Sequence, residues 1–225
     1  MRHQIFESVA AVFFDIDNTL VARDISLRTI LPGWLLKHAP HLDGAELPDH
    51  VDQIMDYDRS GFTDRHEFAT WIRRRYLRKE FATSQIISDF AKAISENIRR
   101  DDSVIDFVLS LRKGYTTGII SNGSGRSQRL KLDRAGLQGA FDDDKIYIEG
   151  ERGMGKPDPE MLLLPFHEHG IIPDRILFIG DHPQEDMSGA ASVGMKTCWI
   201  RGHQALSEVP IKPDVIVESI HDLFP

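Results

Sequence analysis

An apolar run that ends in two closely spaced carboxylates places the strongest constraint on the fold of this chain. Residues Val9–Phe14 are all apolar, and the segment Asp15–Leu20 follows directly. Such a run is typical of a strand covered on both faces, as in a parallel sheet between helices. Because open α/β sheets bind ligands beyond the carboxyl ends of their strands, Asp15 and Asp17 are candidate site residues. Their mutual repulsion favours a bound cation, typically Mg²⁺; the alternative is an Asp-rich turn without a ligand.

A second apolar run leads to the same kind of residue. Ile176–Ile179 continues through Gly180 to Asp181 and Asp186. Gly180 permits a close backbone approach, and Asp186 lies near the start of a predicted helix, Glu185–Val193. The sequence therefore predicts two acidic strand ends.

Between these acidic segments lie a hydroxyl-bearing turn and a lysine. The predicted strand Tyr115–Ile120 runs into Ser121 and Asn122, and the glycine-rich turn that follows has free amides suited to phosphate oxygens. Lys156 precedes a helix that begins with proline, Pro159–His169. Each signal alone is common in turns, caps and helix starts. Their order along one alternating pattern is the specific feature.

Alternating strand and helix signals predict an α/β fold with a Rossmann-like, doubly wound parallel sheet. Strands are expected at Val9–Phe14, Tyr115–Ile120, Lys145–Ile148, Ile176–Ile179, Lys196–Ile200 and Asp214–Val217. The segment 21–100 has its apolar residues at helical spacing, which predicts a smaller all-helical cap domain inserted after the first strand. We expect a core domain made of residues 1–20 and 101–225, and a cap domain made of residues 21–100.

The polar motifs resemble those of the haloacid dehalogenase-like hydrolase superfamily. The matching residues, in chain order, are Asp15 with Asp17, then Ser121, then Lys156, then Asp181 with Asp186. The helical insert lies between the first and second motifs, which is similar to the position of one type of cap domain in this superfamily. The resemblance spans residues 12–186 and indicates the phosphatase branch.

This resemblance implies covalent catalysis. Asp15 would be the nucleophile that carries the phosphoryl group, which divides one difficult displacement into two easier steps. Asp17 would protonate the leaving alcohol and then activate water. A carboxylate at this position is similar to the pattern of members that cleave oxygen esters, whereas dehalogenases and phosphonatases lack it.

The resemblance also implies how phosphate and metal are held. Ser121, Asn122 and Lys156 would bind the phosphoryl oxygens. The implied ligands of Mg²⁺ are Asp15, the backbone carbonyl of Asp17 and Asp181, with Asp186 acting through water or behind these ligands. Without the cation, converging carboxylates would repel an anionic substrate.

Charge and hydropathy limit the classes of binding partner that we expect for this chain. The net charge of −8 argues against a nucleic-acid backbone as the main partner. The chain has no apolar run as long as the roughly 18 residues of a membrane span and no signal-like segment. We expect a cytoplasmic monomer or homodimer that binds a small-molecule phosphate ester, and neither nucleic acid nor membrane. The single cysteine, Cys198, is expected in the core.

One segment matches a different kind of site. Asp56–Glu67 follows the pattern of a twelve-residue calcium-binding loop, with Gly61 at its sixth position. Such loops usually occur in pairs, and this chain has no second copy. Thr63 stands where an aliphatic residue is usual. We favour a helix–turn–helix in which Asp64 caps the second helix.

The expected function is a Mg²⁺-dependent phosphomonoesterase that acts on a small ester, such as a nucleotide or sugar phosphate, through an aspartyl phosphate on Asp15. The enzymatic alternative is a phosphomutase similar to β-phosphoglucomutase, which uses the same core residues. The alternative from another class is a non-catalytic binding protein that has kept the fold. The presence of every charged motif residue argues against this last alternative.

Overall fold

The computed structural model describes residues 4–77, 81–202, 204 and 209–224. The chain divides into two compact units. One is formed by Met1–Val21 with Arg100–Pro225, and the other by Ala22–Arg99. We call them the core unit and the helical unit.

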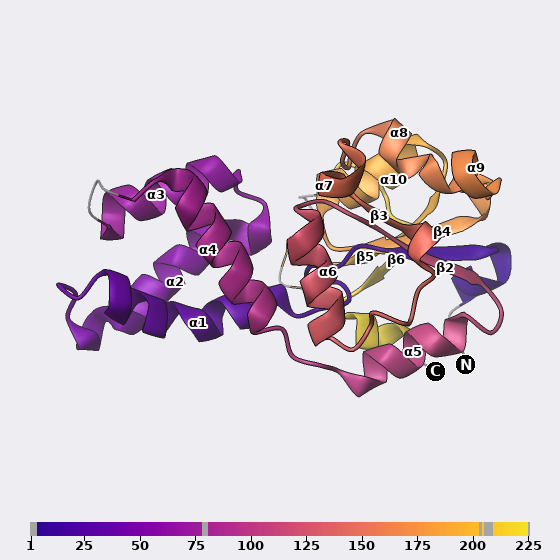
Figure 1. The fold of residues 1–225 in the computed structure, drawn as a ribbon. Helices are drawn as coiled ribbons and strands as arrows, with labels where there is room; N and C mark the ends of the chain where they lie inside the picture. Colours follow the sequence, from indigo (N-terminus) through magenta and orange to yellow (C-terminus); the bar gives the residue numbers. More distant parts are fainter. Residues whose placement is uncertain (1–3, 78–80, 203, 205–208, 225) are drawn as a thin grey trace. The chain divides into compact units, whose positions relative to one another are not determined.

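The core unit is built on one six-stranded sheet in which all neighbouring strands are parallel (Figure 1). Its strands are β1 (Ala11–Phe14), β2 (Thr116–Ser121), β3 (Ile146–Ile148), β4 (Ile176–Gly180), β5 (Lys196–Ile200) and β6 (Val215–Val217). Their order in space is β3-β2-β1-β4-β5-β6. The chain therefore winds outward from β1 in one direction and from β4 in the other. The predicted Rossmann-like fold and its six strands are confirmed.

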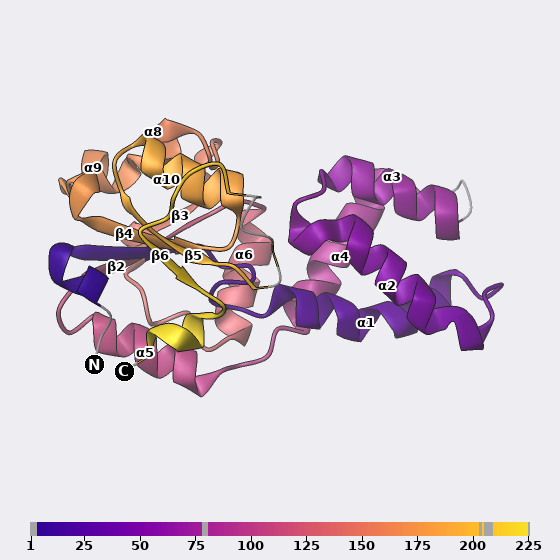
Figure 2. The same ribbon diagram turned by 180° about the vertical axis from the view of Figure 1, so that it is seen from behind.

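Helices cover both faces of this sheet. The helices of the core unit are α5 (Asp102–Leu111), α6 (Gly125–Arg134), α7 (Glu149–Arg152), α8 (Pro159–Leu162), α9 (Leu164–His169) and α10 (Gly189–Ser192). In both views, α8, α9 and α10 lie on one side of the sheet and α5 lies on the other (Figures 1 and 2). The helices on the two faces bury the central strands β1 and β4 completely, which explains why the sequences of these two strands are continuously apolar.

Two predicted helices are divided in the structure. The helix expected at Pro159–His169 is broken between α8 and α9, because Pro165 has no N–H to continue the ladder and its ring crowds the preceding turn. The helix expected at Glu185–Val193 is a π-helix, Pro183–Ser188, followed by α10. The sequence signals located these helices, but the interruptions were not predicted.

The centre of the sheet is tightly packed. Phe13 of β1 is fully buried, and its ring stacks on Tyr147 of β3 with centroids 6.2 Å apart. Gly118 of β2 makes room for this ring, since a Cβ there would lie 2.2 Å from a Phe13 ring carbon. Cys198 of β5 is also fully buried, as predicted, and burial raises the pKa of its thiol to about 12. It is therefore a packing residue and not a reactive thiol.

The helical unit contains α1 (Arg23–His38), α2 (Leu47–Asp58), α3 (Arg65–Tyr76) and α4 (Thr83–Glu96). α1 packs against α2 and α4, and α3 packs against α4 (Figure 2). The buried faces consist of the apolar residues that follow helical spacing, including Leu27, Leu31, Ile72 and Phe90. No strand occurs in this unit among the residues that the structure describes. Likewise, none of the helices described is long and apolar enough to cross a membrane.

Candidate active site

The carboxyl ends of β1 and β4 bring Asp15 and Asp181 together. These strands are neighbours, with Phe14 paired to Ile179, and the backbone N–H of Asp15 donates to the Ile179 carbonyl at 2.9 Å. The strand order reverses between β1 and β4, because the chain leaves them in opposite directions across the sheet. Crevices at such reversals are where open α/β sheets bind ligands.

Three buried carboxylates meet at this place. Asp15, Asp181 and Asp186 can each offer an oxygen so that the three atoms lie within 4.8 Å of one another. The backbone N–H of His182 donates to Oδ2 of Asp186 at 2.9 Å. Gly180 allows this arrangement, since a Cβ there would lie 2.3 Å from the same oxygen. The close approach expected at Gly180 is thus an approach of the Asp186 carboxylate to the backbone.

Lys156 supplies the positive charge of the group. Its Nζ atom lies 2.6 Å from Oδ1 of Asp15 and 2.6 Å from Oδ1 of Asp186. Burial opposes the charge of this amine, but the two carboxylates outweigh burial and raise its pKa above the ordinary value. Lys156 therefore stays protonated and compensates one of the three acidic charges.

The remaining negative charge is poorly compensated. Burial raises the pKa of Asp15 to about 6, against the lowering effect of Lys156. The pKa of Asp181 is raised well above its usual value, mainly by burial and then by Asp186 and Asp15. No group among the described residues donates a hydrogen bond to the Asp181 carboxylate, although this residue is only 6% exposed. A divalent cation would compensate these oxygens, and a set of hard carboxylate ligands fits Mg²⁺.

Ser121 orients the carboxylate of Asp15. It ends β2, and its hydroxyl donates to Oδ1 of Asp15 at 3.0 Å, the same oxygen that contacts Lys156. Within the described part of the chain, no donor reaches Oδ2 of Asp15. One oxygen is thus held by two donors, and the other is open to an incoming group.

The side chain of Asn122, predicted to bind phosphate, contacts the loop that carries Lys156. Its side-chain oxygen accepts from the backbone N–H of Lys156 at 2.7 Å, and its Nδ2 atom donates to the Lys156 carbonyl at 2.8 Å. The same Nδ2 atom donates to Oε2 of Glu185 at 2.8 Å. These contacts use both N–H groups of the Asn122 side chain, and the side chain holds the backbone of Lys156. Phosphate binding by Asn122 stays a prediction.

Glu185 is an additional acidic residue beside the site. Burial raises its pKa to about 7, with Lys156 opposing this effect and Asp186 and Asp15 adding to it. Its position directly before Asp186 was the only sequence signal, and that signal did not distinguish it from an exposed residue of a helix start.

The carboxylate of Asp17 is not part of the group of three. Instead it contacts α6. Nζ of Lys131 lies 2.7 Å from Oδ1 and 2.5 Å from Oδ2 of Asp17, and Nε2 of Gln128 donates to Oδ2 at 3.1 Å. Neither partner of Asp17 was predicted from the sequence. The available signal was that Gln128 and Lys131 share the helix face of the apolar residue Leu132, and all three are buried.

The calcium-like segment of the helical unit forms an ion-pair cluster. Asp58 is fully buried at the end of α2, where its carboxylate accepts from Arg23 at 2.6 and 3.0 Å and from Arg65 at 2.7 Å. Burial opposes the ionisation of Asp58, but the two guanidinium groups outweigh it and lower the pKa. Asp64 caps α3 by accepting from two backbone N–H groups, as predicted. Because Asp58 is occupied by arginine, the segment is arranged as a helix–turn–helix and not as a calcium loop.

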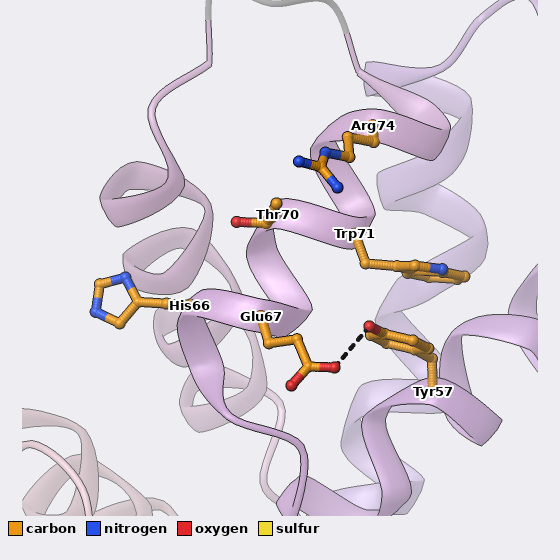
Figure 3. A pocket seen from close by; sticks show the side chains of 6 residues that line it. All are labelled: Tyr57, His66, Glu67, Thr70, Trp71 and Arg74. Carbon is orange, nitrogen blue, oxygen red and sulfur yellow. Dashed lines mark hydrogen bonds between the residues drawn. The ribbon is translucent and has the colours of Figure 1, made fainter.

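A hollow of about 320 Å³ lies on the helical unit (Figure 3). The rings of Tyr57 and Trp71 stack on one side with centroids 4.4 Å apart, and Glu67 accepts from the Tyr57 hydroxyl at 2.9 Å. The other lining residues come from α3: His66, Thr70 and Arg74. The hollow thus offers aromatic surface, a carboxylate and a guanidinium group.

Comparisons with known proteins identify relatives of the whole chain. A family model described as haloacid dehalogenase-like hydrolase matches residues 9–194. The pyrimidine 5'-nucleotidase YjjG of Escherichia coli K12 is 27% identical over 222 residues, which cover 94% of this chain and 95% of that protein. A phosphoserine phosphatase of Thermus thermophilus is 32% identical over 201 residues, which cover 84% of this chain and 80% of that protein.

A solved structure shows the same fold. The putative HAD-hydrolase YfnB of Bacillus subtilis, in a crystal form bound to magnesium, has a TM-score of 0.72 to this chain at 20% identity. The match covers 96% of each chain. At this level of identity the likeness concerns the fold alone.

Proposed function

The chain belongs to the haloacid dehalogenase-like hydrolase family, and on that premise we propose that it is a Mg²⁺-dependent phosphomonoesterase that forms an aspartyl phosphate on Asp15. The observation that carries the proposal is the hydrogen bonding of the two Asp15 carboxylate oxygens. Ser121 and Lys156 hold Oδ1, Oδ2 accepts no hydrogen bond from the described residues, and the uncompensated Asp181 lies beside it. This arrangement supports the proposal that Asp15 is an oriented nucleophile beside a cation site.

In the first step, Oδ2 of Asp15 attacks the phosphorus atom, and the bond from phosphorus to the ester oxygen breaks. Asp17 gives a proton to the leaving alcohol. Lys156 and Ser121, which already lie at the nucleophile, bind the phosphoryl oxygens and compensate their charge. Asp15, the backbone carbonyl of Asp17 and Asp181, with Asp186 acting through water or behind these ligands, would hold Mg²⁺, which would supply further positive charge to the same oxygens.

In the second step, water attacks the phosphorus atom of the aspartyl phosphate. Asp17 accepts a proton from this water, and the bond from phosphorus to Asp15 breaks. Inorganic phosphate leaves, and Asp15 regains its carboxylate. The residue that gave a proton in the first step thus takes one back in the second.

We further propose that the helical unit is a cap that selects the leaving group. The proposed catalytic residues all lie in the core unit, whereas the helical unit offers the hollow around Tyr57, Trp71 and Arg74. Relatives of this chain are named for a nucleotide and for phosphoserine. A small nucleotide or sugar phosphate is the substrate class that we favour. The cytoplasmic location and the monomeric or dimeric state stay predictions.

A phosphate-release screen tests this proposal. We expect release from 4-nitrophenyl phosphate and from some members of a panel of nucleotides and sugar phosphates, and we expect excess chelator to abolish it. Full activity in chelator would contradict the metal assignment. An absence of phosphate release from the whole panel would contradict the enzymatic function.

A further inference from the structure

The buried face of α6 carries two polar side chains that the proposed mechanism does not use. Gln128 is 2% exposed and Lys131 is 6% exposed, although glutamine and lysine side chains are usually found at the surface. Gln128 and Lys131 lie about one helical turn apart, and each contacts the carboxylate of Asp17. A buried amine is unfavourable unless it is paired, so the position of Lys131 requires a specific reason.

The ion pair between Lys131 and Asp17 is a specific one. The hydrogen bonds of the Lys131 amine go to the two oxygens of Asp17, at 2.7 and 2.5 Å, and involve no other group among the described residues. The Lys131 side chain is 8% exposed and that of Asp17 is 25% exposed. An apolar side chain at position 131 would serve the core equally well, because buried ion pairs rarely add stability over well-packed apolar groups. The contact is better explained by its effect on Asp17, whose two carboxylate oxygens it holds in place.

Gln128 connects this carboxylate to the rest of the site. Its Nε2 atom lies 3.1 Å from Oδ2 of Asp17, 3.1 Å from the Ser121 hydroxyl and 2.6 Å from the Asn122 carbonyl. Ser121 in turn donates to Asp15. The amide of Gln128 therefore links Asp17, which is the proposed general acid and base, to Ser121, which orients Asp15. The Asp17 carboxylate is held from two sides and cannot rotate without breaking these contacts.

We propose that Lys131, assisted by Gln128, is a positioning residue that fixes the carboxylate of Asp17 for the attack of water on the aspartyl phosphate. The inference rests on the proposed function and extends it to α6. Water must meet a carboxylate oxygen at a defined place in order to lose its proton, and small misplacements of reacting groups reduce rates strongly. Formation of the aspartyl phosphate from 4-nitrophenyl phosphate needs little help from Asp17, since 4-nitrophenolate leaves without a proton.

The two steps can be measured separately. With 4-nitrophenyl phosphate, kcat/KM reports formation of the aspartyl phosphate, whereas kcat reports its hydrolysis once that step limits turnover. We expect Lys131→Met to lower kcat by about tenfold, less than the roughly 10²–10⁴-fold typical for loss of a general base, and to leave kcat/KM within about twofold. Rapid acid quench should show that the phosphorylated fraction of the enzyme rises.

A matched control removes a cation from the same helix. Arg134 is exposed on α6, so Arg134→Met changes the net charge equally and should leave kcat, kcat/KM and the phosphorylated fraction unchanged. In an Asp17→Asn background, Lys131→Met should have no further effect on kcat, because it acts through Asp17. A further tenfold loss in that background would show that Lys131 acts in some other way.

Gln128→Leu keeps the experiment decisive if Lys131→Met does not fold. It removes the hydrogen bond to Asp17 together with the contacts to the Ser121 hydroxyl and the Asn122 carbonyl, so some loss of kcat/KM is expected, but kcat should fall further than kcat/KM. Equal losses of kcat and kcat/KM in the folded variants would overturn the positioning role while leaving the proposed function intact. A wild-type protein that turns over without a phosphorylated form would instead contradict the proposed function itself.

Discussion

Nζ of Lys156 lies 2.6 Å from Oδ1 of Asp15, although the two residues are 141 positions apart in the chain. The contact is possible because β1 and the loop that carries Lys156 meet at one edge of the sheet. It leaves the amine charged and one oxygen of Asp15 fixed. The same amine also contacts Asp186, so a single cation orders two of the three carboxylates.

Binding of Mg²⁺ should weaken as the pH falls through about 6. The pKa of Asp15 is raised to about 6, so the metal-free folded protein carries a proton on Asp15 at about pH 5, and Mg²⁺ must displace it. Protonation of Asp15 stabilises the folded protein at low pH, and this contribution is lost as the pH rises through about 6. Above this pH, Mg²⁺ can take the place of the proton. Thermal unfolding with and without Mg²⁺ should show a larger increase in Tm at about pH 8 than at about pH 5.

Asp181→Asn is the control for that experiment, because it removes a ligand oxygen charge without changing the size of the side chain. The increase in Tm with Mg²⁺ should then be small at both pH values. An equal increase in Tm at both pH values in the wild type would argue that Mg²⁺ binds elsewhere.

Gly180→Ala should disrupt the metal site. A Cβ at this position would lie 2.3 Å from Oδ2 of Asp186, so the carboxylate must move. We expect a weaker response of Tm to Mg²⁺ and a loss of phosphatase activity. Gly139→Ala is the matched control, since nothing lies within 4 Å of the added carbon there, and its effect on stability should stay within about 0.5 kcal/mol. Unchanged Mg²⁺ binding in Gly180→Ala would mean that Asp186 is not needed for it.

Asp58→Ala should destabilise the helical unit. It would leave the buried guanidinium group of Arg23 without its main partner, and breaking a buried pair in this way typically costs about 3–5 kcal/mol. Asp56→Ala, at an exposed position two residues earlier, should change stability by less than about 0.5 kcal/mol. Calorimetry with Ca²⁺ on the wild type should show no binding to this segment. Calcium binding that both substitutions abolish would restore the calcium-loop interpretation.

Arg74→Gln should alter substrate preference. Arg74 lines the hollow of the helical unit, whereas the neighbouring Arg75 does not and serves as the control. Loss of one contact to the leaving group should change the relative kcat/KM of two phosphate esters by about 1–3 kcal/mol, with the Mg²⁺ dependence unchanged. The two variants should be compared over a panel of nucleotides and sugar phosphates. If Arg74→Gln and Arg75→Gln had the same profile as the wild type, the hollow would have no part in selection.

Those features of the fold and the site that depend on local sequence pattern were predicted from the sequence. The six strands follow from apolar runs, and the positions of Asp15 and Asp181 follow from the rule that parallel strands end at one edge of the sheet. The break in the helix at Pro165 was also visible in principle, because proline inside a helix removes a hydrogen bond.

The contacts between distant segments could not be predicted. Nothing in the local pattern shows that the Asn122 amide contacts the backbone of Lys156, or that Lys131 reaches Asp17 across 114 positions. A lysine within a charged helix is normally assigned to the surface, since charged residues rarely become buried. The grouping of Asp186 with Asp15 and Asp181 depends on the space above Gly180, which is a property of packing.

Identification of the phosphorylated residue tests the central claim most directly. The protein would be mixed with labelled substrate and Mg²⁺, quenched in acid within one turnover, digested, and analysed by mass spectrometry. We predict one acid-stable, hydroxylamine-sensitive phosphate on Asp15 and none in Asp15→Asn. Turnover with the phosphate on another residue, or with no phosphorylated enzyme under conditions where hydrolysis limits the rate, would contradict the mechanism.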